Sequence, residues 1–194
     1  MDALPIARWR TKAIHESITS LVLKRGDTNP DPGIWVFTLG VPYSLVGTTA
    51  TARLRFRMTL KQKVPTNVTV IRTSIDSRLR VGDTIIIDSE RMSVVKIDQS
   101  SDPGFYRLKV TRSETPQVHE SGSNITIPIF DRSAQLVDEN DKNKYYVRLQ
   151  PGDTDRLGDF ALEFEIRETG NPDLRYSLPA TPIPITVVED FNNP

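Results

Sequence analysis

The sequence predicts an all-β protein built from about ten short strands. Apolar and polar residues alternate with a period of two in most segments, and 14 prolines and 10 glycines interrupt the chain at short intervals. Strands and turns spaced in this way are typical of β-sandwiches and barrels. No segment demands a long helix, and no apolar run approaches the roughly 20 residues that span a bilayer.

Residues 1–18 precede the first alternating segment, and the sequence leaves two interpretations of them open. Ile6, Trp9, Ala13 and Ile14 fit one face of a short helix. A loosely ordered arm is an equally good interpretation, because chain termini are often poorly ordered.

Three strands are predicted after this arm. Residues 21–24 alternate and end at a turn, and residues 34–39 are apolar on both faces. The clearest strand is 52–60, where every second residue is apolar and predicts a core-facing side. Its other side carries three guanidinium groups, those of Arg53, Arg55 and Arg57.

The middle of the chain contains strands of its own. Segments 84–87 and 92–97 flank the polar turn 88–91 and together predict a β-hairpin. Segments 106–111 and 125–129 alternate in the same way, which predicts two further strands.

The last third returns to clear alternation. Strands are predicted at 145–150, 160–167 and 183–187. In the second of these, the apolar residues face the core, and Glu163 and Glu165 face outward.

The charges of two predicted strands are complementary. If 52–60 and 160–167 are antiparallel neighbours, the arginines and glutamates pair across the sheet, at roughly 0.2–1 kcal/mol per pair. The alternative is that both are ordinary solvated faces. A structure that places the two strands in different sheets contradicts the pairing.

Charge and composition limit the function classes. The chain has 25 basic and 25 acidic side chains, so no overall charge attracts it to nucleic acid or to an anionic membrane, although a local patch stays compatible with these totals. The absence of cysteine excludes disulfides and thiolate metal sites. The N-terminus lacks the apolar core of a signal peptide, so we expect the chain to stay in the cytoplasm or to enter a particle assembled there.

The sequence contains no recognisable catalytic or metal-binding constellation. His15 and His119 are its only histidines, and each lacks a triad partner at a known spacing, which favours surface or turn positions for both. The acidic run 138–141 fails the spacing of a calcium loop. A second acidic group, Asp153, Asp155 and Asp159, is interpreted as another connecting loop. We therefore expect no enzyme, no cofactor and no metal.

Turn and strand motifs occur in a characteristic order in two separate parts of the chain. The first half has the turn 24–28, the connection 44–50 and the strand start 53–56, and the second has 150–166 followed by 179–188. This order resembles the immunoglobulin-like N-terminal domain of baseplate upper proteins from tailed bacteriophages. The two halves cover about half of the chain.

The residues between these halves resemble a β-cassette found in several phage virion proteins. The matching positions are Gly82, Asp83, Ile85, Ile87, Glu90, Met92, Val94, Leu108, Val110, Arg112, His119, Gly122 and Ile125. The glycine that usually follows the arginine is Ser113 here, so the turn can differ. The resemblance implies structural roles for these positions and no catalytic ones.

These observations predict three parts. We expect an N-terminal arm at 1–18, an immunoglobulin-like β-sandwich formed by 19–63 plus 133–190, and an inserted small β-barrel-like or β-sandwich module at 64–132.

The resemblance implies a structural component of a tailed-phage particle, in the tail, baseplate or neck. Such a protein attaches fibres or neighbouring subunits and assembles with copies of itself and with other virion proteins. We expect no membrane, nucleic-acid or small-molecule partner. The interface candidates are Ile6, Trp9, Arg53, Arg55, Arg57, Glu163 and Glu165.

Two other function classes were weighed against this one. A carbohydrate-binding module that recognises the host surface is the alternative, but aromatic residues make up only 7% of the chain. A cell-wall hydrolase is the third class, and it lacks a site constellation.

Overall fold

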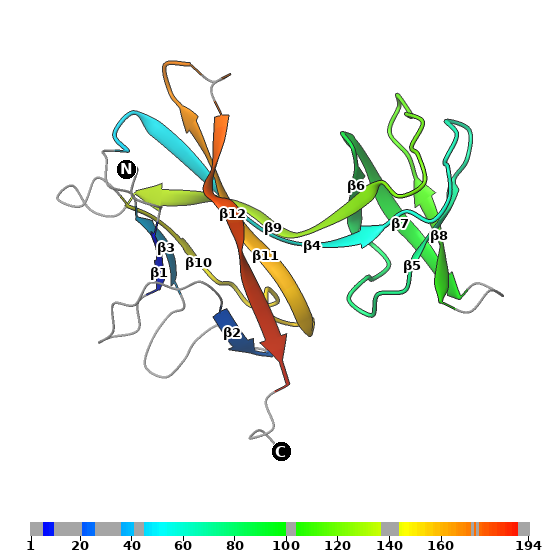
Figure 1. Ribbon diagram of the computed structural model, residues 1–194, viewed down its shortest axis with the longest axis horizontal. Coiled ribbons are helices and arrows are strands. Elements are labelled where there is room, and N and C mark those ends of the chain that lie inside the picture. Colours follow the sequence, from blue (N-terminus) through cyan, green and yellow to red (C-terminus); the bar gives the residue numbers. More distant parts are fainter. Residues whose placement is uncertain are drawn as a thin grey trace. The chain divides into compact units, whose positions relative to one another are not determined.

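The computed structural model describes residues 6–9, 21–25, 36–40, 45–99, 104–136, 144–171, 173 and 175–189. The protein is all-β: 62% of it lies in strands, and no helix occurs in the described ranges. The strands form one mixed hydrogen-bonded sheet (Figure 1). They are β1 (Ile6–Trp9), β2 (Leu21–Lys24), β3 (Val36–Gly40), β4 (Thr48–Thr59), β5 (Val70–Ser74), β6 (Thr84–Ile87), β7 (Glu90–Gln99), β8 (Phe105–Thr111), β9 (Asn124–Leu136), β10 (Lys144–Arg148), β11 (Gly158–Glu168) and β12 (Arg175–Val188).

The chain divides into two compact units. Unit 1 comprises Met1–Leu54 and Ile129–Pro194, and unit 2 comprises Arg55–Pro128. Both boundaries fall inside continuous strands, because β4 and β9 each contribute residues to both units. The sequence interpretation places the boundaries at 63/64 and 132/133. A boundary inside an unbroken alternating strand leaves no local signal in the sequence.

Unit 1 contains two runs of hydrogen-bonded strands. One run is β1-β3-β10-β9 and the other is β2-β12-β11-β4. β2 pairs with β12 in parallel, with Leu21 opposite Ile185, while β1–β3, β3–β10 and β11–β12 are antiparallel. Its core is formed by alternating residues of these strands together with Leu45 and Leu149, which lie just outside β4 and β10. The strand residues are Leu23, Ala50, Ala52, Leu54, Phe130, Tyr145, Val147, Phe160, Leu162, Phe164, Ile166, Ile183, Ile185 and Val187.

The N-terminal residues Ile6–Trp9 form a strand, so both interpretations of this segment, a helix and a loose arm, are wrong for these four residues. β1 pairs with β3, and Trp9 lies opposite Phe37. The partner strand is about 30 residues away in the sequence, and its hydrogen bonds override the weak helical spacing. Ala13 and Ile14 lie outside the described residues.

The last strand is longer than the alternation predicted, and it is irregular. In the β11–β12 ladder, Leu162 lies opposite Ile183, but Phe164 lies opposite Leu178. Four residues of β12, 179–182, therefore lie opposite the single residue Glu163. Two of the four are prolines, which have no N–H to donate to a ladder.

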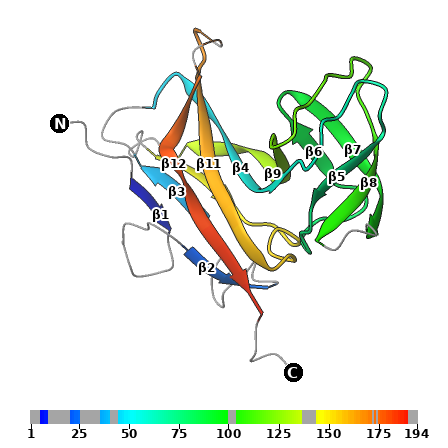
Figure 2. The ribbon, with the colours of Figure 1, turned by 45° about the vertical axis from the view of Figure 1, so that its right-hand side comes forward.

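Unit 2 is a ring of strands in the order β4-β9-β6-β7-β8-β5 (Figure 2). Leu60, which follows β4, bridges to Thr73 of β5, and the Lys61 N–H donates to the Arg72 carbonyl at 2.9 Å. On its other side, the Leu60 N–H donates to the Ser123 carbonyl at 2.9 Å. The hydrogen-bonded ladder therefore returns to the strand on which it began.

The ring encloses the alternating apolar residues of unit 2. Its buried apolar side chains include Phe56, Met58, Leu60, Val64, Ile71, Ile85, Ile87, Met92, Val94, Leu108, Val110, Ile125 and Ile127. The predicted hairpin is present, with Ile87 opposite Glu90 across a two-residue turn. Three polar side chains, those of Thr73, Glu90 and His119, are also buried in this unit.

Candidate functional site

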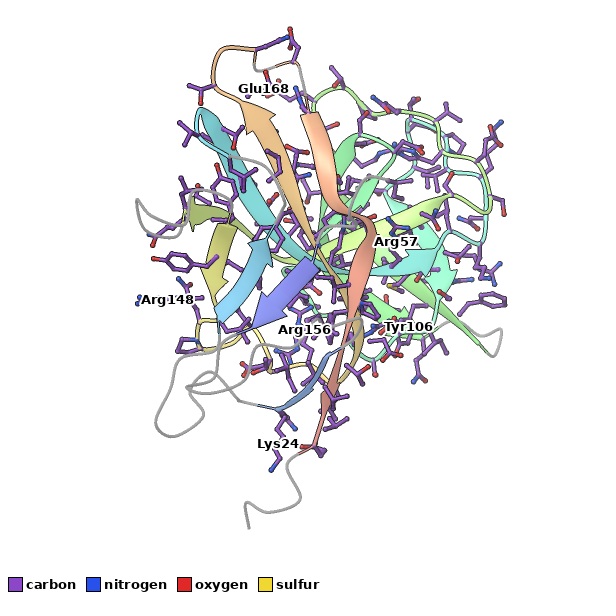
Figure 3. All side chains as sticks on the ribbon, turned by 60° about the vertical axis from the view of Figure 1, so that its left-hand side comes forward. Lys24, Arg57, Tyr106, Arg148, Arg156 and Glu168 are labelled. Carbon is purple, nitrogen blue, oxygen red and sulfur yellow. The ribbon has the colours of Figure 1, made fainter. Side chains whose placement is uncertain are left out.

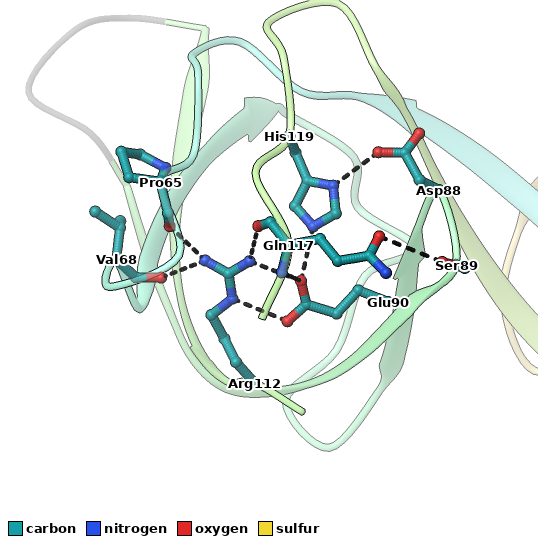
Figure 4. Close-up of polar contacts among 8 residues, drawn as sticks. All are labelled: Pro65, Val68, Asp88, Ser89, Glu90, Arg112, Gln117 and His119. Atoms are coloured by element: carbon teal, nitrogen blue, oxygen red, sulfur yellow. Dashed lines mark hydrogen bonds and ion pairs between the residues drawn. The ribbon is translucent and has the colours of Figure 1, made fainter. Parts of the chain in front are cut away.

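The most concentrated polar chemistry in unit 2 surrounds His119 (Figure 4). The His119 side chain is fully buried, so the interpretation as a surface or turn histidine is wrong. Its Nδ1 atom lies 2.7 Å from Oδ2 of Asp88, and its Nε2 atom lies 2.9 Å from Oε2 of Glu90. Each ring nitrogen therefore has a carboxylate oxygen within hydrogen-bonding distance.

Local backbone geometry places these residues. Glu90 is the first residue of β7 and follows the tight turn at Asp88 and Ser89. Asp88 has a φ of 54°, a left-handed conformation that aspartate tolerates better than most residues. The backbone of His119 exchanges two hydrogen bonds with Val64, of 3.0 and 2.8 Å, which fix the imidazole beside the turn.

Glu90 and Arg112 form a buried bidentate ion pair. The Arg112 Nε and Nη2 atoms donate to the two Glu90 carboxylate oxygens at 2.9 and 2.6 Å. The backbone N–H of Gln117 donates to Glu90 Oε2 at 2.9 Å. The hydrogen bonds from Arg112 lower the pKa of Glu90 to about 2, against the opposing effect of burial, with further help from Gln117 and His119.

The remaining donors of Arg112 are directed at backbone carbonyls. Nη1 donates to the carbonyls of Pro65 at 2.5 Å and Val68 at 3.1 Å, and Nη2 donates to that of Gln117 at 2.5 Å. Together with the two bonds to Glu90, these contacts use all five N–H groups of a guanidinium. The arginine therefore fixes three chain segments at once.

We refer to Asp88, Glu90, Arg112 and His119 as the buried cluster. Its internal hydrogen bonds occupy Glu90, Arg112 and both ring nitrogens of His119, so these groups offer no spare donor or acceptor to a substrate. Asp88 alone is solvent-accessible, with 57% of its side chain exposed. The hydroxyl nearest in sequence, that of Ser89, donates to Gln117 at 3.3 Å and is not aligned with the imidazole. The hydrogen bonds of the cluster link the turn at 88–90 to residues 65–68 and 112–119, and both ring nitrogens of His119 lie beside carboxylates rather than a hydroxyl.

The predicted charge pairing between the arginine strand and the glutamate strand is confirmed for one pair. β4 and β11 are neighbours, and Arg53 Nη1 lies 2.7 Å from Oε2 of Glu165. The Thr169 N–H donates to the Gly47 carbonyl, so later residues of β11 lie against earlier residues of β4 and the strands are antiparallel.

Two further charges extend this pair into a network. The Arg53 Nε atom donates to Asp131 at 3.0 Å, and the Arg167 Nε atom donates to Glu165 at 2.7 Å. Burial lowers the pKa of Arg53, but the hydrogen bonds that it donates to Glu165 and Asp131 outweigh this effect and raise the pKa overall. Burial likewise raises the pKa of Glu165, and its bonds to Arg167 and Arg53 outweigh that effect and lower it.

The other interface candidates do not join this network. Arg55 and Arg57 belong to unit 2, where Arg55 is half-buried and Arg57 is exposed (Figure 3). Glu163 was predicted to face solvent, but it is 6% exposed, because it lies opposite the irregular segment of β12. Ile6 and Trp9 lie in β1.

Asp153 is structural rather than part of an open acidic loop. Its carboxylate accepts two hydrogen bonds from the Arg132 guanidinium, both of 2.6 Å, and one of 2.7 Å from the Gln150 N–H. Only 4% of the Asp153 side chain is exposed. Asp155 and Asp159 are exposed, while His15 and the run 138–141 lie outside the described residues.

Spacing rules could not have found the buried cluster, because its members are separated by turns and strands of irregular length. One signal was present: Glu90, Arg112 and His119 are charged or polar positions within a motif that is otherwise mainly apolar and glycine. A carboxylate, an arginine and an imidazole can be buried together, because each supplies the charge or hydrogen bond that the others need away from water.

The described residues contain no group of three or more His, Cys, Asp or Glu side chains able to hold a metal ion, and no helix long and apolar enough to cross a membrane. Neither protein-family models nor the sequences of curated proteins give a match to this chain.

Proposed function

We propose that the protein is a structural component of a tailed-phage particle, in the tail, baseplate or neck. It acts as an adaptor that attaches fibres or neighbouring subunits. The observation that supports this most is the distribution of the motif positions between the units. The cassette positions 82–125 all belong to unit 2. Most positions that resemble the immunoglobulin-like halves belong to unit 1, namely 24–28, 44–50, 53–54, 150–166 and 179–188, whereas 55–56 belong to unit 2.

We also propose that unit 1 is an immunoglobulin-like β-sandwich and that unit 2 is a small β-barrel inserted into it. The two four-strand runs of unit 1 supply the two layers of such a sandwich, and alternating residues of both runs supply its core. The closed ladder of unit 2 suits a barrel.

The geometry of the cassette positions supports a structural rather than a catalytic role. Gly82 and Gly122 have φ values of 92° and 91°, in the left-handed region that favours glycine. The apolar positions are buried, and Glu90, Arg112 and His119 bind one another. Each of these residues has a role in folding, which leaves the unit to act through its surface.

Attachment to a partner chain requires an accessible surface. β1, which carries the candidates Ile6 and Trp9, pairs with β3 and with no other described strand, so it ends its run. β2 ends the other run in the same way, beside β12. Strands at the end of a run present backbone groups that an added strand can bind.

The proposal is tested on particles made by the genome that encodes the chain. Antibodies against the purified protein are applied to particles from a density gradient, and the bound label is located by electron microscopy. We expect the protein to sediment with the particles and the label to mark the tail, baseplate or neck. Protein that stays in the unsedimented fraction contradicts the proposal. Reproducible binding of the isolated protein on a glycan array, with no particle label, would favour the carbohydrate-binding alternative.

A further inference from the structure

The net charge of zero conceals an uneven distribution between the units. Residues 55–128 contain twelve basic and eight acidic side chains, whereas the rest of the chain contains thirteen basic and seventeen acidic ones. Unit 2 is therefore net positive by four charges and unit 1 net negative by four. The argument from total charge against nucleic-acid binding does not apply to unit 2.

Five of the twelve basic side chains of unit 2 lie close together, on the outer side of three neighbouring strands, β5, β8 and β7, and at Lys61, whose N–H donates to the Arg72 carbonyl. Outward residues here alternate with the buried Ile71, Leu108 and Val110. We call this surface the basic face. Its cations are Lys61, Arg72, Lys96, Arg107 and Lys109.

The strand register places these cations directly beside one another. Arg72 lies opposite Arg107, and Lys96 lies opposite Lys109. Neighbouring strands are about 4.8 Å apart, and like charges directly opposite one another destabilise a sheet. Asp98 is the one acid in these rows of described residues. It lies opposite Arg107 and is bound to Lys96 at 2.8 Å, so it offsets one of these positive charges.

The outer sides of β6 and β9 differ. Their outward residues in unit 2, Thr84, Ile86, Asn124 and Thr126, carry no charge. β4 continues the charged side of the ring, because it carries the outward cations Arg55 and Arg57 and is joined to β5 by the Leu60–Thr73 bridge. Two like-charged pairs side by side suit a ligand that supplies repeated negative charge.

The basic face also includes an aromatic ring. Phe105 is half-buried in β8, and the Arg72 guanidinium lies 5.6 Å from its ring centroid. Single-stranded nucleic acid binds proteins through backbone phosphates along a positive surface and through bases stacked on aromatic or guanidinium planes.

We propose that the basic face binds single-stranded nucleic acid, with phosphates beside Arg107 and Lys109 and a base against Phe105 and Arg72. This inference does not depend on the proposed particle role. The acidic unit 1 of a second copy is the competing partner. Several of its described acids are already neutralised within unit 1, as Asp131 is by Arg53 and Glu189 is by Arg25.

The test measures fluorescence anisotropy of a labelled oligonucleotide of about 16 nucleotides, the upper range of site sizes for one small barrel. The full chain is titrated at several salt concentrations. We expect binding that weakens linearly with the logarithm of salt, with about 0.7 in slope for each phosphate neutralised. The double variant Arg107→Gln with Lys109→Gln should bind roughly ten-fold more weakly and lose about 1.4 in slope.

A matched control removes two exposed cations from unit 1, through Lys24→Gln with Arg148→Gln (Figure 3). This control should bind as the unchanged protein does, and Phe105→Leu should weaken binding by about five-fold or more. No binding by the unchanged protein at low salt, or equal binding by the Arg107/Lys109 variant, overturns the proposal.

Two other outcomes also overturn it and identify a different partner. If heparin competes at equal charge and Phe105→Leu has no effect, the face binds polyanions without using the bases. If the Arg107/Lys109 variant dissociates an oligomer of the unchanged protein and no oligonucleotide binds, the partner is a second copy of the chain.

Discussion

The Nε2 atom of His119 lies 2.9 Å from Oε2 of Glu90, and neither side chain has any exposed surface. The same carboxylate also binds Arg112 and the Gln117 backbone. Removing one member of such a group leaves the others buried without partners, which is more costly than losing the pair as a whole. The cluster is therefore a sensitive point in the stability of unit 2.

Replacing Glu90 with glutamine should strongly destabilise unit 2. The change leaves the Arg112 guanidinium buried without a counter-charge, at a cost of about 3 kcal/mol or more. Hydrogen–deuterium exchange of peptides from β6 to β9 measures this locally. The control is Glu120→Gln, because Glu120 pairs with Lys63 at the surface and should change stability by less than about 1 kcal/mol. Equal effects of the two variants would contradict a structural role for the cluster.

The stability of unit 2 should fall as the solution is acidified. The pKa of Glu90 is about 2 in the folded protein, below its ordinary value of 4.5, so the unfolded chain binds more protons between these values. The stabilisation is complete above about pH 4.5 and is lost as pH falls toward 2, and it amounts to roughly 3 kcal/mol. Hydrogen–deuterium exchange of peptides from β6 to β9, measured from pH 5 to pH 2, tests this loss of stability. Glu90→Gln should lack this part of the pH dependence, and an unchanged slope in that variant would exclude Glu90 as its source.

The Arg53–Glu165 pair should contribute measurably to unit 1. A double-mutant cycle with alanine at both positions should give a coupling free energy of about 1 kcal/mol, since both side chains are largely shielded from solvent. The more exposed pair Arg25–Glu189 is the control and should give a value near zero. Tryptophan fluorescence reports on unit 1 because Trp9 and Trp35 both belong to it. A coupling no larger than that of the control would show that the network adds no stability.

Unit 1 should fold without unit 2. β4 and β9 are sheet neighbours that run in opposite directions, so Leu54 can be joined to Ile129 by an Asn-Gly turn in place of residues 55–128. We expect the shortened chain to unfold cooperatively with a β-type circular dichroism spectrum. A chain without a cooperative transition would show that the two units depend on each other for folding.

The sequence predicts strands well where one face is buried. The alternation in β4 and β11 places Leu54, Phe56, Leu162 and Phe164 on the core side, and all four are buried. The alternation of side chains between the two faces is a local property of a strand, so it does not depend on which strand is its partner. The Arg53–Glu165 pair could be predicted for the same reason, because alternation shows which face of its strand each charged side chain occupies.

Features that depend on distant pairing were not predicted. His119 contacts Asp88 and Glu90, about 30 residues earlier, and only the closure of the ring brings them together. Ile6–Trp9 becomes a strand because β3 is available as a partner. Glu163 is buried because β12 is irregular opposite it. None of these causes is present in the local pattern of the residues concerned.

The closed ladder of unit 2 also affects how the chain can change during evolution. The ring is entered through β4 and left through β9, which lie side by side, so its two ends have the spacing of an ordinary hairpin. We expect that a β-hairpin can accept such a ring in place of its turn. An exchange of residues 55–128 as one segment is therefore the kind of change that recombination could introduce without altering the direction of either flanking strand.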